Sequence, residues 1–274
     1  MPNDPSVPFP NQPLAGQAGL VTGAGRGIGQ ACAIGLAEAG AQVAVLDIDG
    51  EAAERTAAAC RERGVRAIAI ACDVADANAV DAAVAQGEAE LGAVSLAISN
   101  AAWSQRELFH TADMEAFRRT IDVTMWGALH LVRSVARHLI AADRAGAIAL
   151  IGSTHSDRPI PGAMAYNMSK AALDIMARTA ATELAEHRIR LNVIHPGWVD
   201  TPGERKFFTD ETIAERGGAL PWGRLARPDE IARGAVFTLL PGSEYVNGAT
   251  LLIDGGATLP VAEMYRLRQQ PTEG

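Results

Sequence analysis

The chain has 274 residues, of which 48% are hydrophobic and 20% are charged; this composition supports a sizeable core and excludes disordered, collagen-like and coiled-coil chains. The formal net charge of -8 argues against a general nucleic-acid binder, whose footprint is a basic surface. The sequence has no apolar run of the ~20 residues that a membrane helix needs, and its start lacks the basic and apolar regions of a secretory signal. We therefore expect a soluble cytoplasmic protein.

The first 14 residues contain five prolines, which remove backbone donors and predict an extended or disordered arm over 1–14. After the arm, short apolar runs alternate with longer Ala-rich amphipathic stretches, a pattern typical of parallel strands connected by helices. The predicted strands are 20–22, 43–46, 67–71, 96–98, 147–151, 191–194 and 251–253. The predicted helices are 27–39, 50–63, 76–91, 113–142, 163–185 and 228–240. The expected fold is a doubly wound α/β domain of the Rossmann type, with a parallel seven-stranded sheet and helices on both faces.

No linker or repeat divides residues 15–258, so one domain is the simplest organisation. The longest interruption of the strand–helix alternation, about 198–225, is rich in Gly, Pro and charge, and we predict a substrate lid there. Residues 259–274 are expected to form a C-terminal tail. The cysteines Cys32, Cys60 and Cys72 form no Cys-x-x-Cys pair and cannot all pair with one another. We therefore expect reduced core thiols and no metal site.

The first strand leads through a glycine-rich turn directly into a helix. Glycines at 23, 25, 27 and 29 allow a tight turn in which a pyrophosphate approaches the helix N-terminus. The residues expected to hold the cofactor phosphates are Gly23, Gly25, Arg26, Gly27, Ile28 and Gly29. The sequence therefore predicts a dinucleotide site at the start of this helix.

The second strand ends at Asp47, close to the ~20-residue offset at which a carboxylate accepts hydrogen bonds from the adenosine ribose. Such a carboxylate repels the 2′-phosphate of NADP, which favours NAD. Arg26 is the opposing signal, because a guanidinium could pair with that phosphate. Asp73 and Val74, after the third strand, are candidates to bracket the adenine; Asp73 is equally well explained as a helix N-terminal cap.

Five motifs then appear in order: the glycine-rich turn, Ser153, Tyr166-x-x-x-Lys170, Pro196-Gly197 with Thr201, and Asp254-Gly-Gly256. Together they resemble the short-chain dehydrogenase/reductase family over essentially all of residues 15–258. The resemblance implies Ser153, Tyr166 and Lys170 as catalytic residues, and Asn100, Tyr166, Lys170, Pro196, Gly197, Val199 and Thr201 as further cofactor contacts. It also implies a homotetramer in which the helices 113–142 and 163–185 pair between subunits.

The catalytic residue types fit hydride transfer chemistry. Tyr166 and Lys170 stand four residues apart and share one helix face, so we expect the ammonium to lower the pKa of the phenol below its ordinary ~10. Tyr166 then exchanges a proton with an alcohol or carbonyl oxygen, and Ser153 orients that oxygen.

Two positions depart from the family pattern. Ala102 stands where the family has Gly, which narrows the expected floor of the cofactor cleft. Thr124 stands where the family has a catalytic Asn, and its hydroxyl holds a water with fewer hydrogen bonds than an amide does. We expect Thr124 to serve the proton relay from Lys170 with reduced efficiency.

The loops that follow the fourth and fifth strands and the lid supply the expected substrate contacts Trp103, Arg106, His155, Arg158, Trp198 and Arg205. Their polar and aromatic mixture favours a sugar or polyol over a steroid or fatty acyl chain. The arginines leave open a carboxylate, sulfonate or phosphate substrate. An NADPH-dependent carbonyl reductase and a non-catalytic cofactor-binding regulator also remain open. His195 is interpreted as a structural histidine.

Overall fold

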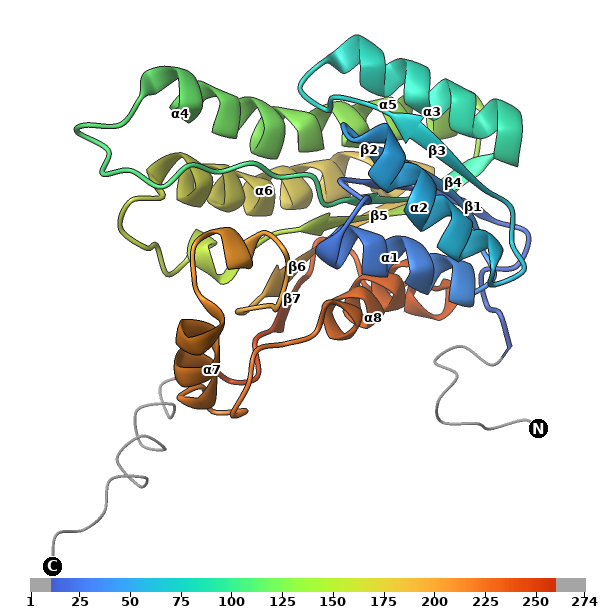
Figure 1. Ribbon diagram of the computed structural model, residues 1–274. Coiled ribbons are helices and arrows are strands. Elements are labelled where there is room, and N and C mark those ends of the chain that lie inside the picture. Colours follow the sequence, from blue (N-terminus) through green and yellow to red (C-terminus); the bar gives the residue numbers. More distant parts are fainter. Residues whose placement is uncertain (1–10, 260–274) are drawn as a thin grey trace, which may run out of the picture.

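The seven apolar runs of the sequence form seven parallel strands in one sheet, in the spatial order β3-β2-β1-β4-β5-β6-β7 (Figure 1). The computed structural model describes residues 11–259. The strands are β1 (Ala18–Thr22), β2 (Gln42–Asp47), β3 (Ala67–Ala71), β4 (Val94–Ser99), β5 (Gly146–Ile151), β6 (Ile189–Pro196) and β7 (Thr250–Ile253). Every residue of β1 and β4 is buried, as expected of strands with helices on both sides. The predicted doubly wound α/β fold is confirmed.

Two helical layers cover the sheet. One layer holds α1 (Gly27–Glu38), α2 (Gly50–Arg61) and α8 (Pro228–Leu239), and the other holds α3 (Ala77–Leu91), α5 (Gly127–Ala141) and α6 (Met164–Glu183). Aspartates at 49 and 76 cap the N-termini of α2 and α3 by accepting backbone hydrogen bonds, and Pro228 occupies the first turn of α8. These local signals explain why the predicted helix starts lie within a residue of the observed ones.

The predicted helix 113–142 is interrupted. It consists of α4 (Met114–Ile121), a π-helical turn over Asp122–Trp126, and α5. Gly127 begins α5, and a Cβ there would lie 2.6 Å from Val74 Cγ2. The glycine therefore lets the start of α5 lie directly against the segment that follows β3, and the extra residue of the π-turn sits beside that contact.

The predicted lid, 198–225, contains regular structure that the sequence did not predict. A short turn over Glu204–Lys206 precedes α7 (Asp210–Gly218), and both lie beyond the carboxyl ends of β6 and β7 (Figure 1). Thr209 caps α7 by accepting from the Thr212 amide, and Asp210 and Glu211 occupy its first turn. This capping pattern was the available signal for the helix.

The described chain is anchored at its start by Leu14, which is fully buried and donates its amide to the Ala39 carbonyl oxygen. Packing thus begins inside the segment predicted as an arm. Residues 1–10 of that arm and 260–274 of the predicted tail lie outside the described residues. Cys32, Cys60 and Cys72 are free and buried, and burial raises their pKa to about 12, 12 and 11.

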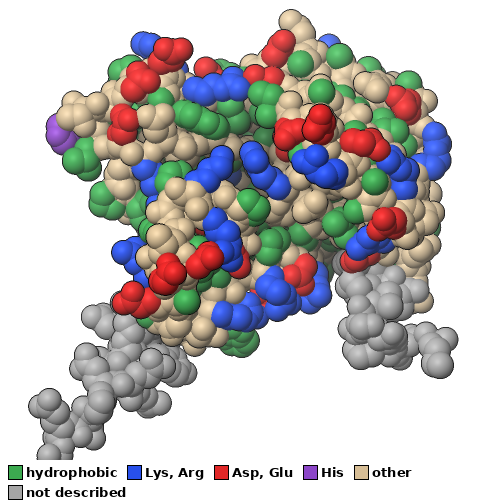
Figure 2. Space-filling model, viewed as in Figure 1, with side chains coloured by type: hydrophobic (Ala, Val, Ile, Leu, Met, Phe, Trp, Pro, Cys, Tyr) green, Lys and Arg blue, Asp and Glu red, His purple; other side chains and the backbone are tan. Residues whose placement is uncertain are grey.

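The surface in Figure 2 mixes acidic and basic side chains over the face in view, with hydrophobic side chains between them. Charges of opposite sign therefore alternate there instead of forming one basic field of the kind that polyanions require. No helix within residues 11–259 is long and apolar enough to cross a membrane.

Candidate active site

The predicted site residues come together at the carboxyl edge of the sheet. Because all strands are parallel, the loops that follow β1, β2, β4, β5 and β6 open at the same edge. The strand order reverses between β1 and β4, and this is where doubly wound folds bind their ligands.

The glycine-rich loop fits a pyrophosphate by its shape. A Cβ at Gly29 would overlap the Gly23 carbonyl oxygen and the Asn100 amide nitrogen, and one at Gly25 would lie 2.9 Å from Asp47 Oδ2. Gly23 has φ +60° and Gly27 has φ +58°, a region that side chains disfavour. No side chain caps the N-terminus of α1, so its first amides remain available to a phosphate.

Asn100 braces this loop. Its side-chain amide donates to the carbonyl oxygens of Thr22 at 3.2 Å and Gly23 at 2.9 Å, and its backbone amide donates to the Thr22 hydroxyl at 3.0 Å. The loop after β4 is thereby tied to the loop after β1. Ala102, two residues further along this segment, is exposed.

The end of β2 supplies a carboxylate at the adenosine side of the site. Asp47 is buried and accepts from the Gly25 amide at 2.8 Å and the Asp49 amide at 3.0 Å. These two backbone bonds fix Asp47 against the glycine-rich loop. Arg26, on the same loop, is exposed.

Asp73 and Val74 have partners that the sequence did not predict. Asp73 accepts from the Ala75 amide at 3.0 Å and from Arg119 at 2.9 Å. Burial raises the pKa of Asp73, but these hydrogen bonds and the guanidinium charge outweigh it and leave the pKa lowered. Val74 is buried, and its carbonyl oxygen lies 3.0 Å from His130 Nδ1.

Ser153, Tyr166 and Lys170 form the centre of the site. Ser153 follows β5, and the other two lie on successive turns of α6, with Lys170 Nζ 5.5 Å from the centre of the Tyr166 ring. Lys170 is 2% exposed and donates to the Ile151 carbonyl oxygen. The helix thus places the ammonium beneath the phenol, as the four-residue spacing predicts.

The expected lowering of the Tyr166 pKa is not found in this state. Burial raises the pKa of Tyr166 to about 12; hydrogen bonding to Ser153 and the charge of Arg106 lower it by less, while Glu204 raises it further. Burial likewise lowers the pKa of Lys170 to about 8, against the charge of Asp174. Desolvation disfavours both charged forms, so the phenol is protonated at neutral pH.

Thr124 lies in the π-turn and is 1% exposed. Its hydroxyl accepts from the Trp103 amide at 3.2 Å and lies 3.2 Å from the Trp103 carbonyl oxygen, to which it donates. The hydroxyl proton is therefore committed to the loop after β4, and one lone pair remains for a water.

The segment after β6 returns to the glycine-rich loop. Gly197 donates to the Ile253 carbonyl oxygen at 2.9 Å, and Val199 is buried and bridges to Ala226. A Cβ on Gly27 would lie 3.5 Å from the Thr201 side chain. Pro196 at the end of β6, Gly197, Val199 and Thr201 thus lead from the sheet to the proposed phosphate loop.

The segment predicted as a lid contains an aromatic and charged cluster that reaches the loop after β4. Glu204 accepts from Trp198 Nε1 at 3.0 Å and lies 3.9 Å from Arg106. The Arg106 guanidinium stands 4.3 Å from the centre of the Phe207 ring and 5.4 Å from that of Phe208. Arg106 thus joins the loop after β4 to the lid.

The remaining predicted substrate contacts divide into two groups. The His155 ring lies 6.3 Å from that of Tyr166, its Nδ1 is 3.3 Å from the Arg158 carbonyl oxygen, and burial lowers its pKa. Arg158 is exposed. Arg205 is exposed and forms ion pairs with Asp200 and Asp210 within the lid segment. In this structure its guanidinium is therefore engaged by carboxylates of the same segment.

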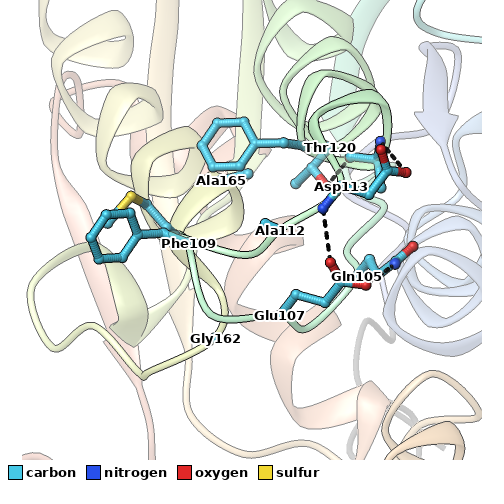
Figure 3. Close-up of a pocket in the computed structure, with 11 residues that line it drawn as sticks. Gln105, Glu107, Phe109, Ala112, Asp113, Thr120, Gly162 and Ala165 are labelled. Atoms are coloured by element: carbon cyan, nitrogen blue, oxygen red, sulfur yellow. Dashed lines mark hydrogen bonds between the residues drawn. The ribbon is translucent and has the colours of Figure 1, made fainter.

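A separate pocket lies beside this centre, between the loop after β4, α4 and the start of α6 (Figure 3). Glu107 accepts there from the Asp113 amide at 2.9 Å and from Gln105 at 2.5 Å. No predicted site residue lines the pocket. Its polar groups therefore brace the loop that carries Arg106.

Three contributors to the site were missed in the sequence: Arg119, Phe208 and Asp174. Arg119 contacts Asp73, and Phe208 contacts Arg106, across long sequence separations, so no local pattern identified them. Asp174 follows Lys170 by one helical turn, and that spacing was an available signal.

Comparison with known proteins decides the family. The family model described as enoyl-(acyl carrier protein) reductase matches residues 23–258. The chain belongs to the short-chain dehydrogenase/reductase family. It is 32% identical to 2,3-dihydro-2,3-dihydroxybenzoate dehydrogenase of Bacillus subtilis (strain 168), over 90% of this chain and 98% of that enzyme. It is 33% identical to sorbitol dehydrogenase of Cereibacter sphaeroides, over 89% of this chain and 98% of that enzyme.

A solved structure of 7α-hydroxysteroid dehydrogenase, complexed with NADH and 7-oxo glycochenodeoxycholic acid, superposes with a TM-score of 0.84 and 30% identity, over 93% of this chain and 98% of that one. This short-chain dehydrogenase/reductase is accordingly an oxidoreductase of small alcohol or carbonyl compounds, in a family that uses a nicotinamide cofactor.

Proposed function

We propose that the protein is an NAD-dependent dehydrogenase of a sugar or polyol, with Tyr166 as the acid/base. The observation that carries this proposal is the meeting of Ser153, Tyr166 and Lys170 beside a loop shaped for a pyrophosphate. Tyr166 and Lys170 come from one helix and Ser153 from the adjoining strand end. A family member without turnover has little need of that arrangement.

In the oxidation, the Tyr166 phenolate accepts the hydroxyl proton of a secondary alcohol or hemiacetal. Ser153 donates a hydrogen bond that holds the substrate oxygen next to the phenol, and the Lys170 ammonium stabilises the phenolate. The bound nicotinamide supplies the acceptor for the hydride that leaves the same carbon. In the reduction the protonated phenol donates its proton, and burial, which raises the pKa of Tyr166, favours that form.

The choice of NAD rests on Asp47. Its carboxylate is buried at the end of β2 and fixed by two backbone amides, where a 2′-phosphate would meet a negative charge. The exposed Arg26 supports the alternative of an NADPH-dependent carbonyl reductase. Gly23, Gly25, Gly27, Ile28 and Gly29 serve the pyrophosphate in either case, and the contacts of Asn100, Pro196, Gly197, Val199 and Thr201 support the same binding cleft.

The substrate end favours neutral hydroxyl groups. Glu204 places a carboxylate among Trp198, Arg106 and the aromatic side chains of the lid, and carboxylates are acceptors for sugar hydroxyls. The sorbitol dehydrogenase relative supports this class. Arg106 favours the second candidate, an anionic substrate, and the dihydroxybenzoate dehydrogenase relative supports that candidate.

We also propose the homotetramer, in which α4, α5 and α6 pair between subunits. Large apolar side chains remain exposed at Trp126 in the π-turn between α4 and α5, at Ile140 in α5, and at Met168 and Ile175 in α6. Exposed apolar patches mark association surfaces. Light scattering after size-exclusion chromatography is expected to give the mass of four chains, and a monomer would contradict this proposal.

The test is reduction of NAD, and separately of NADP, with a panel of polyols, aldoses, acidic sugars and apolar alcohols. We expect turnover of a sugar or polyol with NAD, lost in Tyr166→Phe while NAD still binds. Turnover of acidic sugars alone would favour the anionic substrate. NAD binding without turnover in either direction would favour a cofactor-binding regulator and refute the proposal.

A further inference from the structure

A buried histidine–carboxylate pair stands behind the proposed catalytic residues. His195, in β6, is 4% exposed, and its Nε2 lies 2.8 Å from Asp174 Oδ1 in α6. An ionised carboxylate only accepts hydrogen bonds, so Nε2 carries the proton of this bond. The sequence offered no chemical role for either residue, and their pairing exists only because α6 lies across β6.

The pair is built tightly into the end of the sheet that carries Ser153. A Cβ at Gly152 would lie 2.5 Å from His195 Cδ2, so only a glycine lets the ring occupy this position. Ser156, in the turn that begins at Ser153, has its hydroxyl 3.3 Å from His195 Nε2 and donates to the Ser153 carbonyl oxygen at 2.8 Å. His195 therefore contacts the segment that positions Ser153.

Asp174 connects the pair to Lys170. It follows Lys170 by one helical turn, so both side chains lie on the same face of α6. Lys170 Nζ lies 5.5 Å from the centre of the Tyr166 ring and donates to the Ile151 carbonyl oxygen of β5, and His195 of β6 is linked to the same face of α6 through Asp174. Asp174 is the charged side chain that raises the pKa of Lys170 against burial.

Thr124, which stands at the position of the family's catalytic Asn, does not control the charge of Lys170. The hydroxyl proton of Thr124 is donated to the Trp103 backbone, and no hydrogen bond joins Thr124 to Lys170 among residues 11–259.

We infer that His195 is a positioning residue of the reaction: by donating to Asp174 it fixes that carboxylate one helical turn from Lys170, where the negative charge favours the ammonium form of Lys170. This inference rests on the proposed role of Lys170 beside Tyr166. A neutral Lys170 stabilises the Tyr166 phenolate poorly, so loss of the pair would reduce activity first at alkaline pH.

The chain offers a direct readout, because its lysines are Lys170 and Lys206 alone. In protein labelled with carbon-13 lysine and carrying Lys206→Arg, the single lysine signal reports the protonation of Lys170 without turnover. We expect Asp174→Asn and His195→Leu to move this titration to lower pH. His195→Gln retains a donor and is expected to titrate closer to the parent protein.

The pH dependence of kcat provides the second measurement. The alkaline limb is expected to move to lower pH by about one unit in Asp174→Asn, which corresponds to a tenfold loss above the limb. The matched control is Glu88→Gln, which disrupts a similar pair in which Glu88 Oε2 lies 2.7 Å from His138 Nδ1, between α3 and α5. The control is expected to leave both measurements unchanged.

Each outcome of these two measurements either supports or overturns the inference. An unmoved lysine titration in Asp174→Asn and His195→Leu would overturn the inference, as would an equal fall in kcat at every pH. If one of these variants fails to fold, comparing the lysine titration of His195→Gln with that of the other variant still tests the inference. Failure of the proposed function has a different signature, because the parent protein would then show no turnover or Tyr166→Phe would retain it.

Discussion

The substitution Gly29→Ala tests whether the glycine-rich loop is shaped as the structure has it. The added methyl group would overlap the Gly23 carbonyl oxygen and the Asn100 amide and lie 2.9 Å from the Gly23 carbonyl carbon. Forcing these backbone atoms apart costs about 1–3 kcal/mol. The 2.9 Å bond from Asn100 to Gly23 is then lost, at about 1 kcal/mol. We expect unfolding to become easier by roughly 2–4 kcal/mol.

The assays are urea unfolding and NAD titration by fluorescence. Displacement of the first turn of α1 removes amides from the phosphate, so NAD affinity is expected to fall at least tenfold. The control, Gly35→Ala, lies in the same helix and meets only side chains, with Val236 Cγ2 at 3.3 Å. Its stability should stay within about 1 kcal/mol of the parent, because the gain in helix propensity offsets the tight contact. Parent-like stability and NAD affinity in Gly29→Ala would refute the loop geometry.

Three further predictions concern the centre of the site and its lid. Thr124→Val removes two hydrogen bonds between the buried Thr124 hydroxyl and the Trp103 backbone. At about 0.5–1.5 kcal/mol each, their loss is expected to reduce the free energy of unfolding by about 1–3 kcal/mol in urea melts, whereas equal stability would contradict the bonds. Lys170→Met tests the lowered pKa of the buried Lys170. Between about pH 8 and the ordinary pKa of 10.5, the unfolded parent chain binds a proton at Lys170 that the folded chain does not bind. The free energy of unfolding of the parent relative to Lys170→Met should therefore rise with pH over this range, and a fall would contradict the lowered pKa. Arg106→Leu is expected to reduce kcat/KM at least tenfold by releasing the lid. Arg205→Leu should change kcat/KM less than twofold, because the charge of Arg205 is paired within the exposed lid. The reverse order would favour Arg205 as the substrate contact.

The sequence predicted the fold closely because its signals are local. Buried parallel strands appear as continuous apolar runs, and the aspartates that cap α2 and α3 mark helix starts within the same few residues. Helix α7 was missed because Gly, Pro and charge surround it and its own capping signal is short. The π-turn was missed because no local pattern marks it, and the close approach of Gly127 to Val74 beside it joins residues far apart in the chain.

In the candidate site, too, local patterns were predictable from the sequence and contacts between distant residues were not. The glycine-rich turn, Asp47 and the Tyr166–Lys170 spacing are short-range patterns, so the sequence by itself determined the shape of the glycine-rich loop and the grouping of the proposed catalytic residues. The direction of the Tyr166 pKa depends on burial, which no spacing encodes, and the expectation was wrong for this state. The pairing of Asp174 with His195, the commitment of Thr124 to Trp103 and the closure of the lid through Arg106 and Glu204 were decided only by the tertiary structure. Each of these contacts requires separate elements to pack at a particular distance, and that distance is a property of the whole fold.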